Sequence, residues 1–380
     1  YRSHGYPPEI SLFRSVTGQD KTPPPRDEKA VMADLRAFVA PPPETRWLDE
    51  RWPLLRQEPA PAVASSRPDI VFIVVESLRG QDVGFSSGRT PSITPNIDSL
   101  AASGVAFPHY IANGFASASS FITMQSSTWA HRIRLVSSQN LDLKLDGFPF
   151  RLGQIGYETV LINGCNPEFE KLLNWGLRWY GEVDYQHAQL DSNYLPRMSD
   201  MVLTDHAIER LARHDRENPD KPLMLSLFTT GMHQPYTVDE DGKPPSDDPQ
   251  KRYDRALGHW DTQLGRLLTA LRARPRWNNT VILLVGDHSH YTSESLPEEV
   301  RGMPVDPTVW TSGLVAGPTR LIGPSRRVEA VRSHVDVMPT ILKLAGDRRP
   351  TSALGHDLLG DGEERTTIAV RGHGIRVDRG

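Results

Sequence analysis

Residues 70–75, Ile-Val-Phe-Ile-Val-Val, constrain the fold more than any other stretch of this 380-residue chain. Six consecutive apolar residues, most of them β-branched, are typical of a central strand in a parallel sheet that is covered on both faces. Such a strand delivers the residue that follows it, Glu76, to the carboxyl edge of the sheet, where open α/β folds bind their ligands. Glu76 is therefore a candidate functional residue. From the strand alone, the alternative is an acid that caps a helix.

Strand and helix patterns alternate after this strand, which predicts an α/β fold. We expect a central, mostly parallel sheet flanked by helices, with a small C-terminal subregion. The expected strands cover residues 70–75, 158–162, 223–228, 281–285 and 309–315. The expected helices cover residues 97–103, 202–214, 253–272 and 335–344.

The first 66 residues differ in composition from the rest. Proline clusters at 23–25, 41–43 and 59–61 interrupt them, and residues 28–39 favour one short helix. We interpret residues 1–66 as a linker or juxtamembrane segment that wraps or tethers, and residues 67–380 as the folded domain.

Charge and cysteine content exclude two kinds of site. A formal net charge of -4 argues against a nucleic-acid partner, which usually requires a basic patch. The single cysteine, Cys165, excludes an internal disulfide and a cysteine-rich zinc site.

No apolar run of the sequence approaches the roughly 18 residues of a membrane helix. The chain begins at Tyr1 and shows no signal peptide, so we expect a piece of a longer protein whose membrane anchor lies upstream.

A second apolar strand ends in Gly286, Asp287 and His288. Adjacent Asp and His side chains can both reach a divalent cation if the backbone turns there, and Gly286 permits such a turn. Taken alone, a capping Asp beside a surface His explains the pair equally well. Glu76 strengthens the metal interpretation, because parallel strands end at the same edge. Carboxylates with one imidazole suit Mn²⁺, Zn²⁺, Mg²⁺ or Ca²⁺.

Residues 113–121, Asn-Gly-Phe-Ala-Ser-Ala-Ser-Ser-Phe, supply a candidate nucleophile. Small residues allow close approach of the backbone, and we expect a helix from Phe121 onward. A serine at a helix N-terminus near a metal can be deprotonated and attack phosphorus or sulfur. Without a metal, an N-cap serine is the simpler interpretation.

Histidines near the expected strand ends are further candidates. His233 follows the strand at 223–228, where it can bind a substrate oxyanion or protonate a leaving group, or can simply be solvated. His290 is a weaker candidate of the same kind. His334 lies beside a helix, and we expect it to be structural.

These segments, in this order, resemble the alkaline phosphatase superfamily, in particular its sulfatase and lipoteichoic acid synthase-like branch. The resemblance runs from about residue 69 to residue 346 and implies an alkaline phosphatase/sulfatase-like fold, with 67–380 as a sulfatase-like catalytic domain. Four motifs carry it: Glu76-Ser77-Leu78-Arg79, similar to the first metal-ligand strand end; residues 94–98, similar to Thr-Pro-Asn-Leu-Asp; Gly286-Asp287-His288, similar to the Gly-Asp-His metal motif; and residues 334–340, similar to the late Val-Asp-Pro-Thr helix start.

The resemblance also implies roles for individual residues. Glu76, Asp287 and His288 would bind one divalent metal, with Mn²⁺ as the expected ion. His233 resembles the substrate-contacting His of lipoteichoic acid synthases and phosphoethanolamine transferases. His290 and Arg79 are the other expected substrate contacts.

The position of the nucleophile depends on the alignment. Matching residues 129–132, Trp-Ala-His-Arg, to the sulfatases' Tyr-Pro-His-Arg makes Ser117 both the nucleophile and a metal ligand. Anchoring on Gly114 and Phe121, as in the synthases' Gly-Lys-Thr-Ser-Asp-Ser-Glu-Phe, places Ala116 there instead. Alanine cannot attack, so that alignment implies an inactive or substituted protein. We favour Ser117.

Departures from the sulfatase pattern favour phosphoryl chemistry. Sulfatases convert a Cys or Ser in Cys/Ser-x-Pro-Ser-Arg to formylglycine, whereas residues 117–121 contain neither the Pro nor the Arg. One acid, Glu76, stands where sulfatases usually have paired aspartates. Residues 166–169 offer no clear equivalent of the Trp and Arg that bind phosphoglycerol in the synthases. The resemblance therefore leaves open a substrate other than phosphoglycerol.

The sequence therefore predicts a metal-dependent phosphotransferase or phosphodiesterase that acts on a phospholipid head group or a phosphorylated glycan through a covalent phosphoserine. The alternatives are a sulfatase and a catalytically silent domain with the same fold. We expect an extracytoplasmic location, at the periplasmic face of the inner membrane, as the soluble domain of a membrane-anchored protein.

Overall fold

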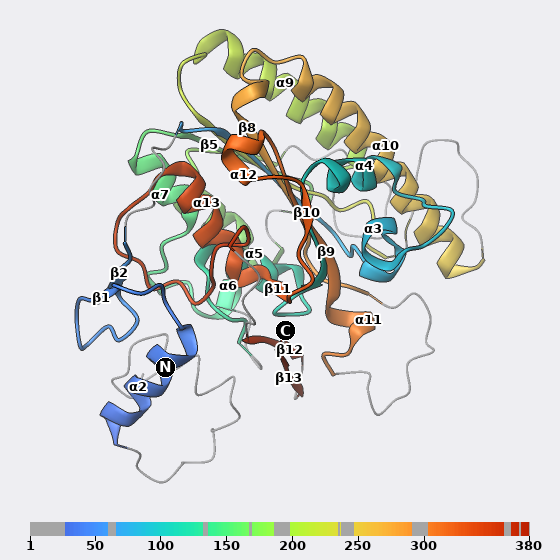
Figure 1. The fold of residues 1–380 in the computed structure, drawn as a ribbon. Coiled ribbons are helices and arrows are strands. Elements are labelled where there is room, and N and C mark those ends of the chain that lie inside the picture. The colour runs from blue at the N-terminus through green and yellow to red at the C-terminus, as the bar shows by residue number, and fades with distance from the viewer. Residues whose placement is uncertain are drawn as a thin grey trace.

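A mixed β-sheet runs through the centre of the protein, and helices cover both of its faces (Figure 1). The computed structural model describes residues 27–59, 66–131, 136–166, 169–185, 198–234, 236, 247–290, 303–360, 366–371 and 374–379. Within these residues the sheet has nine strands, in the order β10-β4-β9-β8-β3-β7-β5-β6, and β11 also pairs with β4. The strands are β3 (Asp69–Val75), β4 (Val105–Ile111), β5 (Glu158–Asn163), β6 (Glu182–Asp184), β7 (Leu223–Phe228), β8 (Thr280–Gly286), β9 (Trp310–Ala316), β10 (Arg326–Arg327) and β11 (Arg332–Ser333).

The sheet is mostly parallel, as expected. Strands β8, β3, β7, β5 and β6 form one parallel block, and β9 is antiparallel to both β8 and β4. All five expected strands are present, with ends within one residue of the expectation. Strand β4 was not expected, because Pro108 interrupts its apolar pattern. At this proline the register of β4 against β9 shifts, between Phe107 and Tyr110. Strands β6, β10 and β11 are too short to produce a pattern.

Strand β3 is buried along its whole length because its side chains alternate between two cores. Ile70, Phe72 and Val74 pack into the core on one face, and Val71 and Ile73 pack into the core on the other. The first core is covered by α5 (Ser117–Ser126), α6 (Val136–Gln139), α7 (Phe148–Gln154), α8 (Leu172–Trp179) and α13 (Val337–Ala345). The second is covered by α3 (Gly84–Ser87), α4 (Pro95–Ser103), α9 (Asp200–Glu217) and α10 (Pro249–Arg272).

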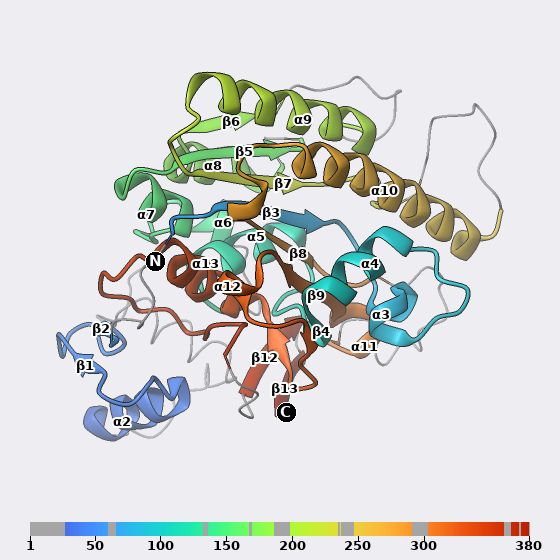
Figure 2. The ribbon, with the colours of Figure 1, turned by 45° about the horizontal axis from the view of Figure 1, so that its top comes forward.

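Helix α10 shows how the sequence produces this layer. Its apolar stripe is buried against the sheet and against α9, which lies beside it (Figure 2). Asp248 caps the helix by accepting hydrogen bonds from the backbone N–H groups of Gln250 and Lys251. Each fully buried leucine of the stripe contributes about 1.5–3 kcal/mol to folding. Trp260, Leu264 and Leu267 are at most 1% exposed.

Five expected helix starts are corrected. Helices α4, α9 and α10 begin two to four residues before the expected positions, at Pro95, Asp200 and Pro249. Helix α5 begins at Ser117, not at Phe121, with Ala116 as its N-cap residue. Helix α13 begins at Val337, because His334–Asp336 form a separate 3₁₀ turn closed by a capping box between Ser333 and Asp336.

The described part of the N-terminal segment packs on the domain. Helix α2 (Glu28–Val39) has the expected bounds, and the short strands β1 (Arg46–Trp47) and β2 (Arg56–Gln57) follow it. Leu35 and Leu54 share a core with Trp129 and Val335. The buried Arg56 donates a hydrogen bond to the Ala353 carbonyl at 2.9 Å. Residues 1–26, 60–65, 132 and 167–168, which enter the sequence expectations, lie outside the described residues.

The expected C-terminal subregion is a two-stranded hairpin of β12 (Thr366–Arg371) and β13 (Gly374–Arg379). Two short helices, α11 (Asp306–Val309) and α12 (Thr319–Ile322), flank β9. Among the helices of the described residues, none has the length and apolarity required to cross a bilayer.

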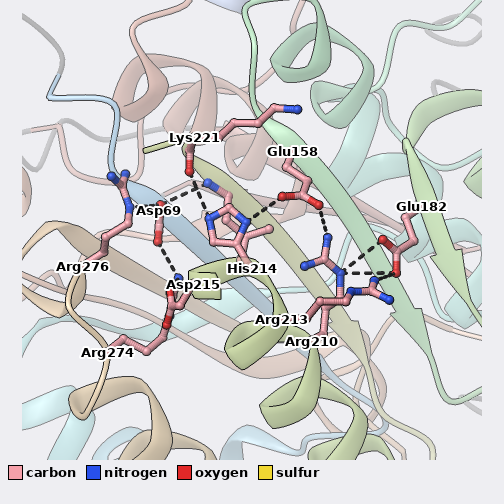
Figure 3. Close-up of polar contacts among 11 residues, drawn as sticks. Asp69, Glu158, Glu182, Arg210, Arg213, His214, Asp215, Lys221, Arg274 and Arg276 are labelled. Atoms are coloured by element: carbon pink, nitrogen blue, oxygen red, sulfur yellow. Dashed lines mark hydrogen bonds and ion pairs between the residues drawn. The ribbon is translucent and has the colours of Figure 1, made fainter. Parts of the chain in front are cut away.

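Ion pairs hold together the amino edge of the sheet (Figure 3). Asp69, fully buried at the start of β3, pairs with Arg274 at 3.0 Å and with Arg276 at 2.9 Å. Glu158, at the start of β5, pairs with both Arg210 and His214 of α9. Because β3 and β5 begin here and end at the opposite edge, this network lies far from Glu76.

Candidate active site

Three potential metal ligands meet at the carboxyl edge of the sheet. Glu76 directly follows β3, and Asp287 and His288 directly follow β8. The two strands are parallel neighbours in which Val75 is paired with Gly286, so their ends lie side by side. One ligand atom from each of Glu76, Asp287 and His288 lies within 4.8 Å of the others, and all three residues are buried. The structure thus brings together the ligands expected from the sequence.

Ser117 completes this cluster from the N-terminus of α5. Its Oγ donates a hydrogen bond to Oε2 of Glu76 at 3.0 Å and lies 3.3 Å from Nε2 of His288. The residue is half-buried, so the hydroxyl is reachable from outside. Ala116 precedes the helix and brings no functional group to the cluster. Of the two candidate positions, Ser117 is therefore the one whose side chain contacts the cluster.

Backbone groups hold the carboxylate of Asp287 in one orientation. Its Oδ1 accepts hydrogen bonds from the N–H groups of Ser77 at 2.8 Å and His288 at 2.7 Å, which leaves Oδ2 for a ligand. Ser77 reaches this position with a left-handed backbone, φ 50°. The Ser120 hydroxyl binds the Asp287 carbonyl at 2.6 Å.

The other two ligands are oriented in a similar way. Ser77 Oγ donates to Oε1 of Glu76 at 2.8 Å, and the Glu76 N–H donates to Oγ1 of Thr229 at 3.0 Å. Nδ1 of His288 lies 3.1 Å from the Ser289 carbonyl, which can only accept, so Nδ1 carries the proton. The lone pair of Nε2 then faces the two carboxylates, as a metal-binding imidazole requires.

Gly286 has a role other than the expected one. Its φ lies outside the left-handed region, so the turn does not need glycine for its backbone angles. Instead, a Cβ atom at this position would lie 1.9 Å from Oγ1 of Thr311 and 2.7 Å from Cβ of Leu78. Close packing at the end of β8, not backbone freedom, requires glycine here.

The electrostatics of the cluster suit a cation. Burial, together with the neighbouring charge of Glu76, raises the pKa of Asp287 to about 7. Burial is the largest single influence on Glu76 and acts against its ionisation, but the nearby imidazoles of His288 and His233, together with hydrogen bonds from Ser77 and Ser117, outweigh it and lower the pKa of Glu76. Two buried carboxylates facing one imidazole form a site with excess negative charge. This donor set fits a divalent cation that accepts oxygen and nitrogen ligands.

The expected substrate contacts occupy three different settings. His233 is exposed on the loop after β7, where its charge acts on Glu76. His290 lies near the same loop, with Nδ1 3.5 Å from both Gln234 and the Tyr236 hydroxyl. Arg79 is only 2% exposed and pairs with Asp82 at 2.6 Å. Its expected contact with a substrate stays a prediction.

Two further groups support the site: Thr229, which sequence reasoning overlooked, and His334, which it expected to be structural. Thr229 directly follows β7, so the rule that identified Glu76 after β3 applies to it as well. His334 is fully buried, and its Nε2 lies 2.9 Å from the Gly286 carbonyl, immediately before Asp287. His334, which we expected to be structural, thus lies directly beside the potential metal ligands that follow β8.

Comparisons with known proteins agree with the fold. The mixed sheet and its flanking helices give the chain an α/β fold similar to that of solved structures from the alkaline phosphatase superfamily. Similar structures include a superfamily protein from Vibrio parahaemolyticus, with TM-score 0.74 and 20% identity over 93% of this chain and 88% of that one. The lipoteichoic acid synthase LtaP from Listeria monocytogenes gives TM-score 0.69 and 17% identity over 89% and 84%. A phosphonate monoester hydrolase from Agrobacterium radiobacter gives TM-score 0.62 and 18% identity over 80% of each chain.

The chain belongs to the sulfatase family, whose model matches residues 68–347. A curated relative, the lipoteichoic acid synthase of Staphylococcus aureus strain USA300, is 24% identical over 332 residues, which are 81% of this chain and 48% of that protein. The chain thus spans about half the length of the curated relatives it matches. The resemblance to this superfamily and to its sulfatase and lipoteichoic acid synthase-like branch is confirmed.

Proposed function

We propose that this protein is a metal-dependent phosphotransferase or phosphodiesterase that acts on a phospholipid head group or a phosphorylated glycan. The observation that carries the proposal is the contact of Ser117 Oγ with both Glu76 and His288, beside Asp287. A hydroxyl held against potential metal ligands is the arrangement of an activated nucleophile. Relatives described as a lipoteichoic acid synthase and a phosphonate monoester hydrolase support chemistry at phosphorus.

Glu76, Asp287, His288 and Ser117 would hold one divalent cation, and we propose Mn²⁺ as that ion. When bound, such a cation lowers the pKa of an oxygen ligand and neutralises charge on a phosphoryl group. Oδ2 of Asp287 and Nε2 of His288, 3.5 Å apart, are the atoms available to it. The negative charge of the Glu76 and Asp287 carboxylates provides the affinity for the cation.

The side chains of the site account for each bond and proton of the proposed reaction. Ser117 Oγ forms a bond to phosphorus while the bond from phosphorus to the leaving alcohol breaks. The serine proton has an acceptor in place at Oε2 of Glu76, 3.0 Å away. His233, exposed beside the cluster, gives a proton to the leaving alcohol. In the second half of the reaction, an acceptor alcohol or water gives its proton to the now neutral His233 and attacks phosphorus, and the bond from phosphorus to Ser117 Oγ breaks. Ser117 Oγ then takes back the proton held by Glu76.

The loop around Ser117 favours phosphoryl over sulfuryl transfer. Residues 117–121 contain neither the Pro nor the Arg of the sulfatase modification motif, and a single acid, Glu76, follows β3. A sulfatase remains the second candidate because the family model is that of sulfatases. Mass spectrometry of the purified chain distinguishes the two, since a sulfatase requires formylglycine at position 117.

The experiment compares the Mn²⁺-loaded chain with Ser117→Ala, Ala116→Thr and Ser119→Ala on labelled phospholipid. We expect Ser117→Ala to lose at least about 10³-fold in turnover, because it removes the nucleophile. Ser119→Ala is the matched control in the same turn of α5 and should retain activity. Equal turnover of wild type and Ser117→Ala contradicts the proposal. Activity in Ala116→Thr alone supports the other alignment, and a metal-free, inactive protein supports a silent domain.

We also propose the cellular setting expected from the sequence. Residues 67–380 would work as the catalytic domain at the periplasmic face of the inner membrane, joined through residues 1–66 to an upstream anchor. The similar proteins are named as synthases of lipoteichoic acid, an envelope polymer, which supports an extracytoplasmic site of action. Fractionation of cells that express the whole gene tests it, because the domain should then be in the membrane fraction and accessible to protease added to spheroplasts.

A further inference from the structure

The C-terminal hairpin is bonded directly to the loop that carries the nucleophile. The side-chain amide of the buried Asn113 donates to the Ile368 carbonyl at 2.7 Å and to Oγ1 of Thr367 at 3.0 Å. In return, the Val370 N–H donates to the Asn113 carbonyl at 3.0 Å. Residues 366–379 lie outside the stretch that matches the family model, residues 68–347. A part of the chain beyond that match therefore borders the site.

This attachment places Arg371, the last residue of β12, beside the cluster. Its guanidinium carbon lies 3.6 Å from the centre of the Phe115 ring. The same ring lies 5.0 Å from the ring of His288 and 5.7 Å from that of His290. Added together, these distances put the Arg371 charge within about 9 Å of the His288 ring, which is comparable to one Debye length at physiological salt.

Arg371 differs from Arg376, the arginine on the neighbouring strand of the hairpin. Arg376 pairs with Asp378 at 2.8 Å and with Asp306. Arg79, although close to Glu76 in sequence, is buried against Asp82. Arg371 instead lies against the Phe115 ring, which is next to the ring of His288.

We propose that Arg371 is a specificity-determining residue that favours substrates and intermediates carrying two or more negative charges near the reacting phosphorus. The proposal rests on the proposed function and narrows its substrate class to multiply charged phosphate esters, such as phosphorylated glycans. The physical reason is that Coulomb energy is linear in the charge of the substrate. Removing the positive charge of Arg371 therefore lowers affinity by the same factor for each negative charge on the substrate. A dianion then loses affinity by the square of the factor that a monoanion loses.

The size of the effect follows from distance and screening. At about 9 Å, at an effective dielectric constant of roughly 20 to 40 and at low ionic strength, where the Debye length is about 30 Å, the loss is roughly 5- to 20-fold for each substrate charge. A purely structural role, in which Arg371 only supports the Phe115 ring, has no such dependence on substrate charge. The ratio between two substrates therefore separates the two roles.

The first measurement compares kcat/KM of the Mn²⁺-loaded wild type, Arg371→Gln, Arg371→Lys and the matched control Arg376→Gln at pH 8 and an ionic strength of about 0.01 M, where screening is small. The substrates are bis(p-nitrophenyl) phosphate, a monoanion, and p-nitrophenyl phosphate, a dianion. We expect Arg371→Gln to lose roughly 5-fold or more on the monoanion and roughly 25-fold or more on the dianion, mainly through KM. Arg371→Lys keeps the charge and should stay close to wild type on both, as should Arg376→Gln. Equal losses on both substrates, or equal losses in Arg371→Lys and Arg371→Gln, overturn the inference.

A second measurement makes the result independent of turnover. Inorganic phosphate is titrated calorimetrically into Mn²⁺-loaded Ser117→Ala, with and without Arg371→Gln. The inference requires phosphate to bind and Arg371→Gln to weaken that binding at least roughly tenfold, and absence of either result overturns it. Failure of the proposed function has a different signature: turnover that is unaffected by Ser117→Ala while phosphate binding still depends on Arg371.

Discussion

Ser117 Oγ and Glu76 Oε2 lie 3.0 Å apart, although 41 positions separate the two residues in the sequence. One residue begins a helix and the other follows a strand, so only the packing of α5 against the end of β3 can bring them together. The contact joins the proposed nucleophile to a proposed metal ligand. Substitutions at the residues that hold these two side chains in place test the arrangement.

Asp287→Asn should prevent Mn²⁺ binding and, at the same time, stabilise the metal-free fold. Asn keeps an oxygen that can accept the hydrogen bonds of Ser77 and His288, but it removes a buried charge that faces Glu76. Burial and Glu76 raise the pKa of Asp287 to about 7, so its ionised form destabilises the metal-free fold at pH 8. We expect the metal-free variant to be more stable than wild type by about 2–4 kcal/mol in urea unfolding. Wild type should gain thermal stability with Mn²⁺ while the variant does not, and equal Mn²⁺ stoichiometry in both would count against the site.

His334 should make stability depend on pH in mildly acidic solution. Burial lowers the pKa of His334 to about 4, from 6.5, despite its hydrogen bond to Gly286. Below pH 6.5 the unfolded chain binds a proton that the folded protein excludes, so this contribution is complete above pH 6.5 and is lost as the pH falls toward 4. The difference amounts to about 3 kcal/mol. Urea unfolding with chelator present should show a steeper loss between pH 7 and 4.5 for wild type than for His334→Gln, and identical slopes would refute this assignment.

Gly286→Ala should damage the metal site through crowding. The added Cβ would lie 1.9 Å from Oγ1 of Thr311, which itself donates a hydrogen bond to the Leu78 carbonyl at 2.6 Å. We expect a stability loss of about 1–3 kcal/mol and weaker Mn²⁺ binding, because Asp287 must shift. Gly153→Ala in α7 is the control, since its Cβ meets nothing closer than 4.0 Å and alanine favours the helix. Unchanged metal affinity in Gly286→Ala would contradict the packing argument.

Asp69→Asn should weaken the fold without affecting the chemistry. Asp69 is fully buried and pairs with Arg274, whose side chain is 4% exposed (Figure 3). Removing one partner of a buried pair costs about 3 kcal/mol. Because β3 places Asp69 and Glu76 at opposite edges, about 20 Å apart, kcat should stay at the wild-type value. Asp205→Asn, which removes an exposed pair with Arg266, should cost less than about 1 kcal/mol, and equal losses in the two variants would contradict the role of burial.

Local sequence patterns predicted the strands and the potential metal ligands. An apolar run such as residues 70–75 can be satisfied only by burial on both faces, and parallel strands end at one edge. Glu76, Asp287 and His288 could therefore be placed together before their distances were known. Strand β4 was missed for the converse reason, because Pro108 breaks the local pattern while tertiary pairing with β9 retains the strand.

The sequence by itself determined the class of fold and predicted three potential metal ligands, because both depend on short-range patterns of apolar and polar residues. Only the tertiary structure shows that the side chain of Ser117, and not that of Ala116, contacts Glu76. It also turned Arg79 inward and brought Arg371 to the Phe115 ring. Contacts between residues so far apart in the chain leave no local pattern, because they are set by how whole elements pack.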